Sequence, residues 1–302
     1  MTTVCVQTAA EAALLGELPG TVDVVVWDGR GSAPPSVPQV DLLVAGYMAA
    51  PMSAAAVATM PRLRVIQVLS AGVETWLPMV PAGVVLCNGR GVHGGSTAEL
   101  AIAGISSLLR ELPRLHEAQR AHEWLQIHTD GLAGTRVLVI GSGDIGARIG
   151  AAATAFGADV GYVNRSGHDG AHRLAELAQL LPHAGVVVLA LPLTAQTSGL
   201  VDARFLAAMP DGAILANIAR GQLVDTDALL AERTAGRLRA FLDVTDPEPL
   251  PPEHPLWDAP GLLLTPHIGG GTRGWDRRAF ALVRGQVLRL DAGQPLLNVV
   301  ER

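Results

Sequence analysis

The sequence predicts an α/β fold made of two doubly wound parallel-sheet domains, with the second domain inserted in the first. Three observations predict it. Short β-branched segments alternate with helical ones, as in a parallel sheet covered by helices, and this alternation occurs twice along the chain. A last helix follows the second set of strands and can return to the first domain. We therefore expect one domain from residues 1–95 and 270–302 and the other from residues 96–269.

The first domain contains four apolar segments with the composition of buried parallel strands. They are Val22–Trp27, Asp41–Gly46, Val65–Ser70 and Val84–Asn88. A short helix with an N-cap is predicted over Ser53–Met60. After the fourth strand, Ser96 and Glu99 form a capping-box pattern, which predicts a long helix over Ala98–Leu112 that ends before a proline.

The second domain begins its sheet at Arg136 and continues the alternation of strands and helices. The predicted strands are Arg136–Ile140, Asp159–Val163, Val186–Leu191, Ala213–Asn217, Arg239–Val244 and Leu262–Leu264. The predicted helices are Asp144–Phe156, Leu174–Leu181, Thr226–Thr234 and, after the last strand, Trp275–Asp291.

Composition excludes several function classes. All 22 basic residues are arginine, so Schiff-base enzymes, P-loop NTPases and dehydrogenases with a Tyr-Lys pair are excluded. A net charge of −6 without basic clusters argues against nucleic acid or an anionic membrane as partner. Cys5 and Cys87, the only cysteines, supply no disulfide framework or metal site. The longest apolar stretch, Val186–Leu193, is too short to span a membrane, and we expect a soluble cytoplasmic protein.

A glycine-rich turn between a predicted strand and a predicted helix indicates dinucleotide binding. It runs Gly141-Ser142-Gly143-Asp144-Ile145-Gly146. The first glycine makes a tight turn, the second lets the backbone approach a pyrophosphate, and the third allows close helix–strand packing. The helix N-terminus then offers N–H groups to phosphates. A methyltransferase could use similar glycines, so this motif alone leaves that alternative open.

The end of the following strand favours NADP(H) over NAD(H). NAD enzymes usually carry Asp or Glu there for the ribose hydroxyls, whereas this strand ends with Asn164, Arg165 and Ser166. A guanidinium can pair with a 2′-phosphate through two hydrogen bonds. We therefore expect NADP(H) to be preferred and NAD(H) to remain possible.

Three segments near later strand ends carry residue types suited to hydride chemistry on a carboxylated substrate. They contain Arg220, Glu248 and His267. Ligands of open α/β sheets bind at the carboxyl ends of the strands. An Arg there can bind an anion, and a His paired with a carboxylate can supply the proton that ketone reduction needs.

Together these motifs resemble the D-isomer-specific 2-hydroxyacid dehydrogenase family over nearly the whole chain. The motifs are Leu69–Glu74, Gly141–Gly146, Ala190–Thr194, Asn217–Gly221, Asp243–Pro251 and Thr265–Gly270, in the family's order. The chain is most similar to the glyoxylate/hydroxypyruvate reductase-like branch, chiefly through Asn164-Arg165-Ser166. The resemblance implies a Rossmann NAD(P)-binding domain inserted in a discontinuous flavodoxin-like substrate domain.

The resemblance also implies a role for each matched residue. Arg220 binds the substrate carboxylate, His267 exchanges a proton with the reacting oxygen, and Glu248 orients His267 and favours its protonated form. The substrate carboxylate is also bound by backbone N–H groups of Ala71, Gly72 and Val73. Besides the glycine-rich turn and the strand end at 164–166, the residues implied to contact the cofactor are Leu191, Pro192, Ile218, Ala219 and Asp243.

The leading hypothesis is an oxidoreductase that transfers hydride between NADP(H) and a small 2-oxo or 2-hydroxy acid, acting as a homodimer. The family also includes transcriptional corepressors, so a dinucleotide-sensing interaction protein without significant turnover is the alternative. The substrate side chain is not predicted. Its pocket is expected among Tyr47–Met52, Leu69–Glu74, Trp76, His93 and Trp275. For His93 a structural role is favoured over substrate contact, and for the two tryptophans a role in the core or an interface.

Overall fold

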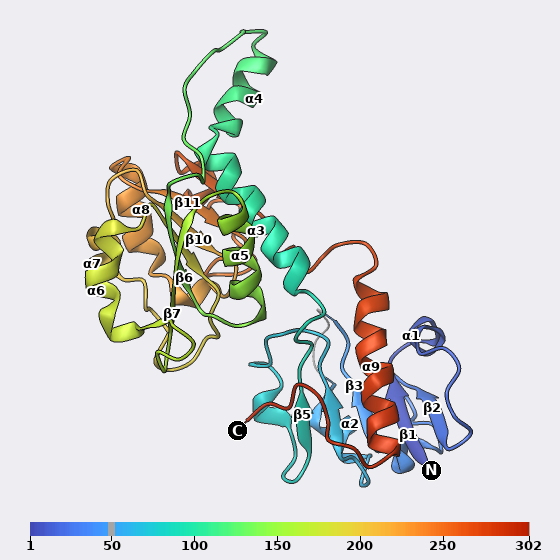
Figure 1. Cartoon of the computed structure of the whole chain (residues 1–302). Coiled ribbons are helices and arrows are strands. Elements are labelled where there is room, and N and C mark those ends of the chain that lie inside the picture. Colours follow the sequence, from blue (N-terminus) through green and yellow to red (C-terminus); the bar gives the residue numbers. More distant parts are fainter. Residues whose placement is uncertain (48–51, 302) are drawn as a thin grey trace. The chain divides into compact units, whose positions relative to one another are not determined.

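The computed structural model describes residues 1–47 and 52–301, and the chain divides into two compact units. Unit 1 comprises Met1–His93 and Gly271–Arg302, and unit 2 comprises Gly94–Gly270. Each unit is a parallel sheet with helices, which confirms the predicted fold class (Figure 1). Residues 48–51, which belong to the predicted substrate pocket, lie outside the described residues.

Unit 1 has a five-stranded sheet among its described residues, in the order β2-β1-β3-β4-β5 that is typical of flavodoxin-like folds. Its strands are β1 (Thr2–Val6), β2 (Val22–Val26), β3 (Leu42–Val44), β4 (Val65–Gln67) and β5 (Val85–Cys87). Its helices are α1 (Ala9–Leu14), α2 (Ala54–Ala58) and α9 (Trp275–Asp291). Strand β1 and helix α1 were not among the predicted elements, although Thr8 and Glu11 form a capping box at the start of α1.

Side chains alternate along the strands of the unit 1 sheet, and both of its faces contribute residues to a buried core. On β1, Val4 and Val6 join one core cluster, which includes α9, while Cys5 joins the other. Helix α9 therefore returns to the first sheet, as its position after the second sheet predicted. Burial raises the pKa of the Cys5 thiol to about 12 and that of Cys87 to about 11, and both thiols are free. Trp76 belongs to the core, as favoured above.

Unit 2 has a seven-stranded sheet in the order β12-β11-β10-β9-β6-β7-β8, counted over its described residues. The strands are β6 (Arg136–Ile140), β7 (Asp159–Asn164), β8 (His172–Arg173), β9 (Val186–Leu189), β10 (Ile214–Asn217), β11 (Arg239–Leu242) and β12 (Leu262–Leu264). The helices are α3 (Gly94–Leu109), α4 (Leu112–Arg120), α5 (Asp144–Ala155), α6 (Leu177–Leu180), α7 (Ala203–Ala208) and α8 (Thr226–Thr234). This order contains the Rossmann arrangement, with β6 and β9 at the point where the strand order reverses.

Helix α3 differs from the helix predicted over Ala98–Leu112. It begins at Gly94, before the predicted capping box, because a glycine lets it start against α5: a Cβ at Gly94 would lie 1.9 Å from Asp144 Oδ2. It ends at Leu109, and Glu111 takes a left-handed conformation with φ 53°. Pro113 then lies in the first turn of α4, where its missing N–H costs no helical hydrogen bond.

Helix α4 and the segment up to residue 130 form an arm that projects from the rest of unit 2 (Figure 1). Ala118 is the one buried residue of α4. Residues 114–134 thus combine a helix with a mostly exposed loop.

Candidate active site

The predicted site residues of unit 2 follow the carboxyl ends of its parallel strands. The glycine-rich turn follows β6, Asn164 ends β7, Leu191 follows β9, Ile218 follows β10, and the remaining two segments follow β11 and β12. All these strands run in one direction, so their carboxyl ends share one edge of the sheet. The fold brings the unit 2 candidates together at this edge.

Close backbone packing explains two glycines of the turn after β6. Gly141 has φ +109°, and a Cβ there would lie 2.2 Å from the Ala190 carbonyl oxygen on the neighbouring loop. A Cβ at Gly146 would lie 1.8 Å from the Gly141 carbonyl oxygen. Side chains at these positions would push α5 away from the sheet. The turn therefore has the tight geometry predicted for it.

The start of α5 is open to a ligand. Gly143 is the N-cap and makes no side-chain capping hydrogen bond, and a Cβ at Gly143 would meet no atom within 4 Å. Asp144 turns to Arg148, whose Nε donates to Asp144 Oδ1 over 2.8 Å, so this carboxylate does not cap the helix. Uncapped N–H groups and the positive end of the helix dipole favour a phosphate here. The residues fit a dinucleotide pyrophosphate.

Asn164 shapes the loop that follows β7. Its Oδ1 accepts from the backbone N–H groups of Ser166 and Gly167, at 3.1 and 2.6 Å, and its Nδ2 donates to Ser142 Oγ on the glycine-rich turn over 3.0 Å. Arg165 is exposed on this loop, and no described residue makes an ion pair or hydrogen bond with its guanidinium. Its charge is therefore available to an anion beside the glycine-rich turn.

The Arg220 loop follows β10 and is shaped by Asn217, which is buried. Asn217 Nδ2 donates to the Arg220 carbonyl oxygen over 2.8 Å, and its Oδ1 accepts from Ala219 N–H at 3.1 Å. Gly221 lets this loop touch the next one, since a Cβ there would lie 1.9 Å from the Thr245 carbonyl oxygen. The loops after β10 and β11 are therefore packed backbone to backbone.

His267 and Glu248 form a direct pair. His267 Nδ1 and Glu248 Oε1 are 2.5 Å apart, and both side chains are 37% exposed. A carboxylate only accepts, so Nδ1 carries the proton in this pair and Nε2 is left for other chemistry. His267 has a left-handed backbone with φ 53°, which is uncommon for a residue other than glycine and typical of functional sites. Two residues predicted to act together are in contact.

Asp243 holds the His267 loop in this conformation. Its buried carboxylate accepts from Thr265 Oγ1 at 2.6 Å, from Ile268 N–H at 2.9 Å and from Gly269 N–H at 2.8 Å. Its backbone oxygen accepts from His267 N–H at 2.7 Å. The sequence analysis assigned Asp243 to the cofactor alone and missed this role. A carboxylate has about four acceptor positions, so one remains for a carboxamide.

In unit 1, the loop after β4 offers three backbone donors. Its carbonyl oxygens are occupied: Ser70 O accepts from Gly89 N–H, Ala71 O from Asn88 Nδ2, and Gly72 O from Ser70 Oγ. The N–H groups of residues 71–73 have no acceptor within the described part of the chain. Successive free N–H groups form an anion-binding concavity. Asn88 was not among the predicted site residues, and only its position at a strand end could have indicated it.

No group of three or more His, Cys, Asp or Glu side chains in residues 1–47 and 52–301 is arranged to hold a metal ion. In the same residues, no helix has both the length and the apolar character needed to cross a membrane.

Comparison with protein families gives a match for more than half of the chain. Residues 102–269 match the model described as "D-isomer specific 2-hydroxyacid dehydrogenase, NAD binding domain". This range includes β6 to β12 and every predicted site residue of unit 2.

Individual proteins give matches over greater lengths. Glyoxylate/hydroxypyruvate reductase A of Salmonella paratyphi C is 30% identical over 255 residues, which is 80% of this chain and 81% of that protein. For the same reductase of some other Salmonella strains, the matched part spans about half of the relative's length.

Two solved structures share the fold over essentially the full chain. A D-isomer specific 2-hydroxyacid dehydrogenase from Xanthobacter autotrophicus Py2, in complex with NADPH and MES, has a TM-score of 0.87 and 30% identity, with 99% of this chain and 98% of that chain covered. The NADPH-dependent glyoxylate/hydroxypyruvate reductase of Sinorhizobium meliloti, in complex with NADP and sulfate, has a TM-score of 0.86 and 26% identity, with 100% and 98% covered.

Proposed function

Because the chain belongs to the D-isomer specific 2-hydroxyacid dehydrogenase family, we propose that it is a cytoplasmic, NADPH-dependent reductase of small 2-oxo acids such as glyoxylate or hydroxypyruvate. The observation that carries the proposal is the His267–Glu248 pair at the ligand-binding edge of the unit 2 sheet. The test follows NADPH loss with glyoxylate, hydroxypyruvate and phenylpyruvate. Dinucleotide binding without turnover of any of them would favour the alternative of a dinucleotide-sensing interaction protein.

Gly141, Gly143 and Gly146 would hold the pyrophosphate of the cofactor, since the start of α5 is uncapped, the backbone packs closely at Gly141 and Gly146, and the space beside Gly143 is open. Leu191, Pro192, Ile218 and Ala219 belong to the adjoining loops. When bound, NADPH supplies the hydride that reduces the keto carbon. The chain's own residues bind the carboxylate, orient the carbonyl and supply the proton.

His267 is the proton donor in this proposal. Its Nδ1 is committed to Glu248, so the proton moves from Nε2 to the keto oxygen, and the negative charge of Glu248 stabilises the imidazolium before transfer. Arg220 pairs with the substrate carboxylate and polarises the keto oxygen. In unit 1, the N–H groups of residues 71–73 are proposed donors to a substrate carboxylate. In the reverse direction, His267 removes the proton from the hydroxyl.

The preference for NADPH rests on Arg165. Its exposed guanidinium stands on the loop that Asn164 ties to the glycine-rich turn, and that loop carries no carboxylate from residue 164 to 168. A 2′-phosphate would pair with this cation, whereas a ribose 2′-hydroxyl would gain little from it. The Sinorhizobium meliloti reductase and the Xanthobacter autotrophicus protein were solved with NADP and NADPH, which supports the proposal by analogy.

Arg165→Ala should raise the KM for NADPH by about 10–100-fold, because hydrogen bonds to charged groups are worth about 1.5–3 kcal/mol. The KM for NADH should stay within a factor of about two, since NADH has no 2′-phosphate. The measurement is initial rates with each cofactor at saturating 2-oxo acid. Arg136→Ala, at the amino end of β6, is the matched control and should leave both values unchanged. Tighter use of NADH by the unaltered protein would refute the preference.

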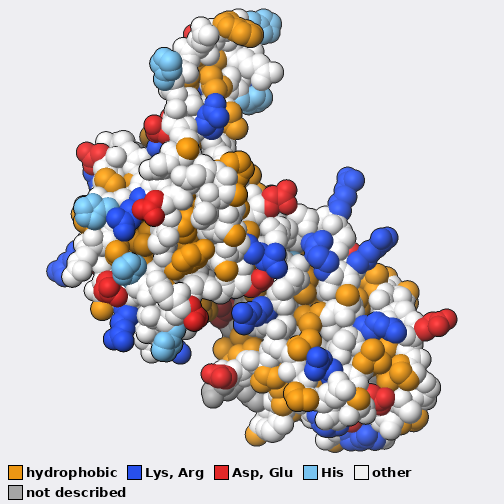
Figure 2. Space-filling view, in the orientation of Figure 1, with side chains coloured by type: hydrophobic (Ala, Val, Ile, Leu, Met, Phe, Trp, Pro, Cys, Tyr) orange, Lys and Arg blue, Asp and Glu red, His pale blue; other side chains and the backbone are white. Residues whose placement is uncertain are grey.

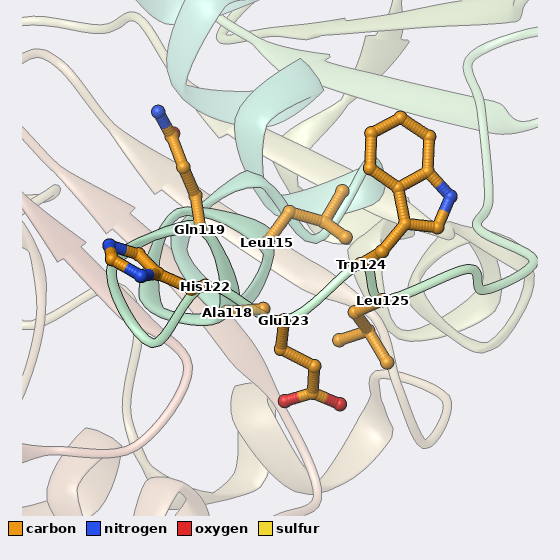
Figure 3. Close-up of a pocket in the computed structure, with 7 residues that line it drawn as sticks. All are labelled: Leu115, Ala118, Gln119, His122, Glu123, Trp124 and Leu125. Carbon is orange, nitrogen blue, oxygen red and sulfur yellow. The ribbon is translucent and has the colours of Figure 1, made fainter.

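The projecting arm supports a homodimer. Trp124 is 94% exposed, and Figure 2 shows hydrophobic side chains on the arm beside histidines. Leu115, Trp124 and Leu125 line a hollow of about 420 Å³ together with Gln119 and His122. Figure 3 shows Gln119 and His122 on the side opposite Trp124 and Leu125. An apolar surface on a projecting element is unfavourable in water unless a partner covers it. A second copy of the chain can do so through a two-fold interface.

Trp124→Ser should raise the dimer dissociation constant at least about 30-fold, since a buried interface tryptophan often contributes about 2 kcal/mol or more. Light scattering over a dilution series measures the dissociation constant. Phe156→Ser is the matched control, because Phe156 is also an exposed aromatic residue of unit 2 but lies outside the arm. A monomeric unaltered protein at assay concentration, or equal dimer stability in both variants, would contradict the proposal.

A further inference from the structure

The carboxylate loop of unit 1, residues 69–73, has each of its peptide planes fixed by a hydrogen bond to a carbonyl oxygen. A trans peptide is planar, so its carbonyl and the next N–H point in opposite directions. Fixing a carbonyl therefore aims the N–H of the following residue. Gly89 N–H donates to Ser70 O over 2.7 Å, which sets the direction of Ala71 N–H. Ser70 Oγ donates to Gly72 O, also over 2.7 Å, which sets the direction of Val73 N–H.

Asn88 aims the central donor of the loop. Its Nδ2 donates to Ala71 O over 3.2 Å, which turns Gly72 N–H outward. Asn88 itself is well held: its Oδ1 accepts from Arg90 N–H at 3.1 Å, and its backbone oxygen accepts from Gln67 Nε2 at 3.0 Å. Asn88 thus connects the carboxylate loop to the buried end of β5.

His93 fixes the entry to the loop. Its Nε2 lies 3.0 Å from Leu69 O, and because a carbonyl oxygen only accepts, Nε2 carries the hydrogen. His93 is 6% exposed, so removing this donor would leave a buried carbonyl without its side-chain partner. The Leu69 carbonyl also packs closely on the backbone of Gly89, where a Cβ would lie 2.1 Å from its oxygen, so residue 89 has no room for a side chain.

Two aromatic rings hold the His93 ring in its orientation. Tyr47, which follows β3, is stacked on it with ring centroids 4.6 Å apart and planes 20° apart. Trp275 is the first residue of α9, and the centroid of its ring lies 4.3 Å from that of Tyr47 and 5.9 Å from that of His93. The donor on Nε2 therefore comes from a ring that packing prevents from rotating.

We infer that His93 and Asn88 are positioning residues that hold the carboxylate loop with the N–H groups of residues 71–73 aimed at the substrate carboxylate. Neither touches the substrate. The inference rests on the proposed function, because it is that function which gives the loop a carboxylate to bind. Loss of either residue weakens substrate binding and leaves cofactor binding and proton transfer in place.

The test compares two replacements of His93 in the whole enzyme. His93→Phe keeps an aromatic ring for Tyr47 but loses the donor, whereas His93→Gln keeps a donor near the place of Nε2 but loses the ring. We expect His93→Phe to raise the KM for hydroxypyruvate about tenfold, and His93→Gln to stay within about threefold of the unaltered enzyme, since a lost buried hydrogen bond costs about 1–3 kcal/mol. The kcat and the KM for NADPH should change less than about threefold.

Two further measurements keep the test decisive if His93→Phe fails to fold. The dissociation constant of oxamate, a 2-oxo acid analogue that is not reduced, should rise with the KM for hydroxypyruvate. Asn88→Ala, at a half-buried position, should raise both about tenfold with Tm little changed. If Asn88→Ala and the soluble His93 variants bind oxamate like the unaltered enzyme, or if His93→Gln loses as much as His93→Phe, the inference is wrong. An unaltered enzyme that reduces no 2-oxo acid would instead overturn the proposed function, and this inference with it.

Discussion

We expect His267→Ala to lower kcat for 2-oxo acid reduction by about 10²–10⁴-fold, the usual contribution of a positioned general acid. In the structure, only one ring nitrogen of His267 is available for proton transfer. Nδ1 is bound to Glu248 at 2.5 Å, and Nε2 has no partner among the described residues. Without the imidazole, the proton must come from water, which is a far weaker acid. NADPH affinity should be unchanged, because no cofactor-binding role is assigned to His267.

Two measurements and two further variants make this expectation specific. Initial rates with saturating hydroxypyruvate give kcat, and quenching of tryptophan fluorescence gives the NADPH dissociation constant. Glu248→Gln keeps an acceptor for Nδ1–H but removes the charge, so it should lower kcat less than His267→Ala does. His254→Ala is the matched control, since His254 caps a turn in the same unit and accepts from Leu256 N–H. A kcat within about threefold of normal in His267→Ala would remove it from the proposed mechanism.

The predicted residues of unit 2 could be grouped from the sequence because each belongs to a short motif at a strand end. Because parallel strands run in one direction, motifs at their carboxyl ends lie at one edge of the sheet, and this can be predicted before the packing is known. Gly141 and Gly146 were predicted from their spacing. The structure explains why both must be glycine, since the Ala190 carbonyl oxygen lies close to Gly141 and the Gly141 carbonyl oxygen lies close to Gly146. The Glu248–His267 contact follows in the same way, since β11 and β12 are neighbours in the sheet.

Other features depend on contacts between residues that are distant in the sequence, and a local sequence pattern does not predict such contacts. Helix α3 starts at Gly94 because Asp144, 50 residues later, leaves room for no side chain there. Asp243 holds Ile268 and Gly269, although its spacing resembled only a cofactor ligand. The hydrogen bond from Asn88 to the carboxylate loop depends on the pairing of β4 with β5, which the local sequence does not indicate. A local capping pattern at Ser96 was outweighed by helix–helix packing, as tertiary contacts commonly outweigh local propensity.

Arg220 is the second residue for which we expect a large effect. Arg220→Ala should lower kcat/KM for 2-oxo acids by about 30–3,000-fold, because truncating one partner of a buried charge pair costs about 2–5 kcal/mol. The clamp acts on the carboxylate in the ground state and on the carbonyl in the transition state, so KM should rise while kcat falls. Asn217, which holds the Arg220 backbone, keeps the loop in place in the variant.

Arg220→Lys separates charge from geometry. Lysine keeps the positive charge but cannot form two parallel hydrogen bonds with a carboxylate, so it should recover only part of the lost kcat/KM. Arg204→Ala, an exposed arginine on α7, is the matched control and should behave like the unaltered enzyme. Full recovery by lysine would mean that charge alone suffices. Unchanged kcat/KM in Arg220→Ala would mean that the carboxylate is bound elsewhere, and the backbone N–H groups of residues 71–73 would then have to account for its binding without a cation.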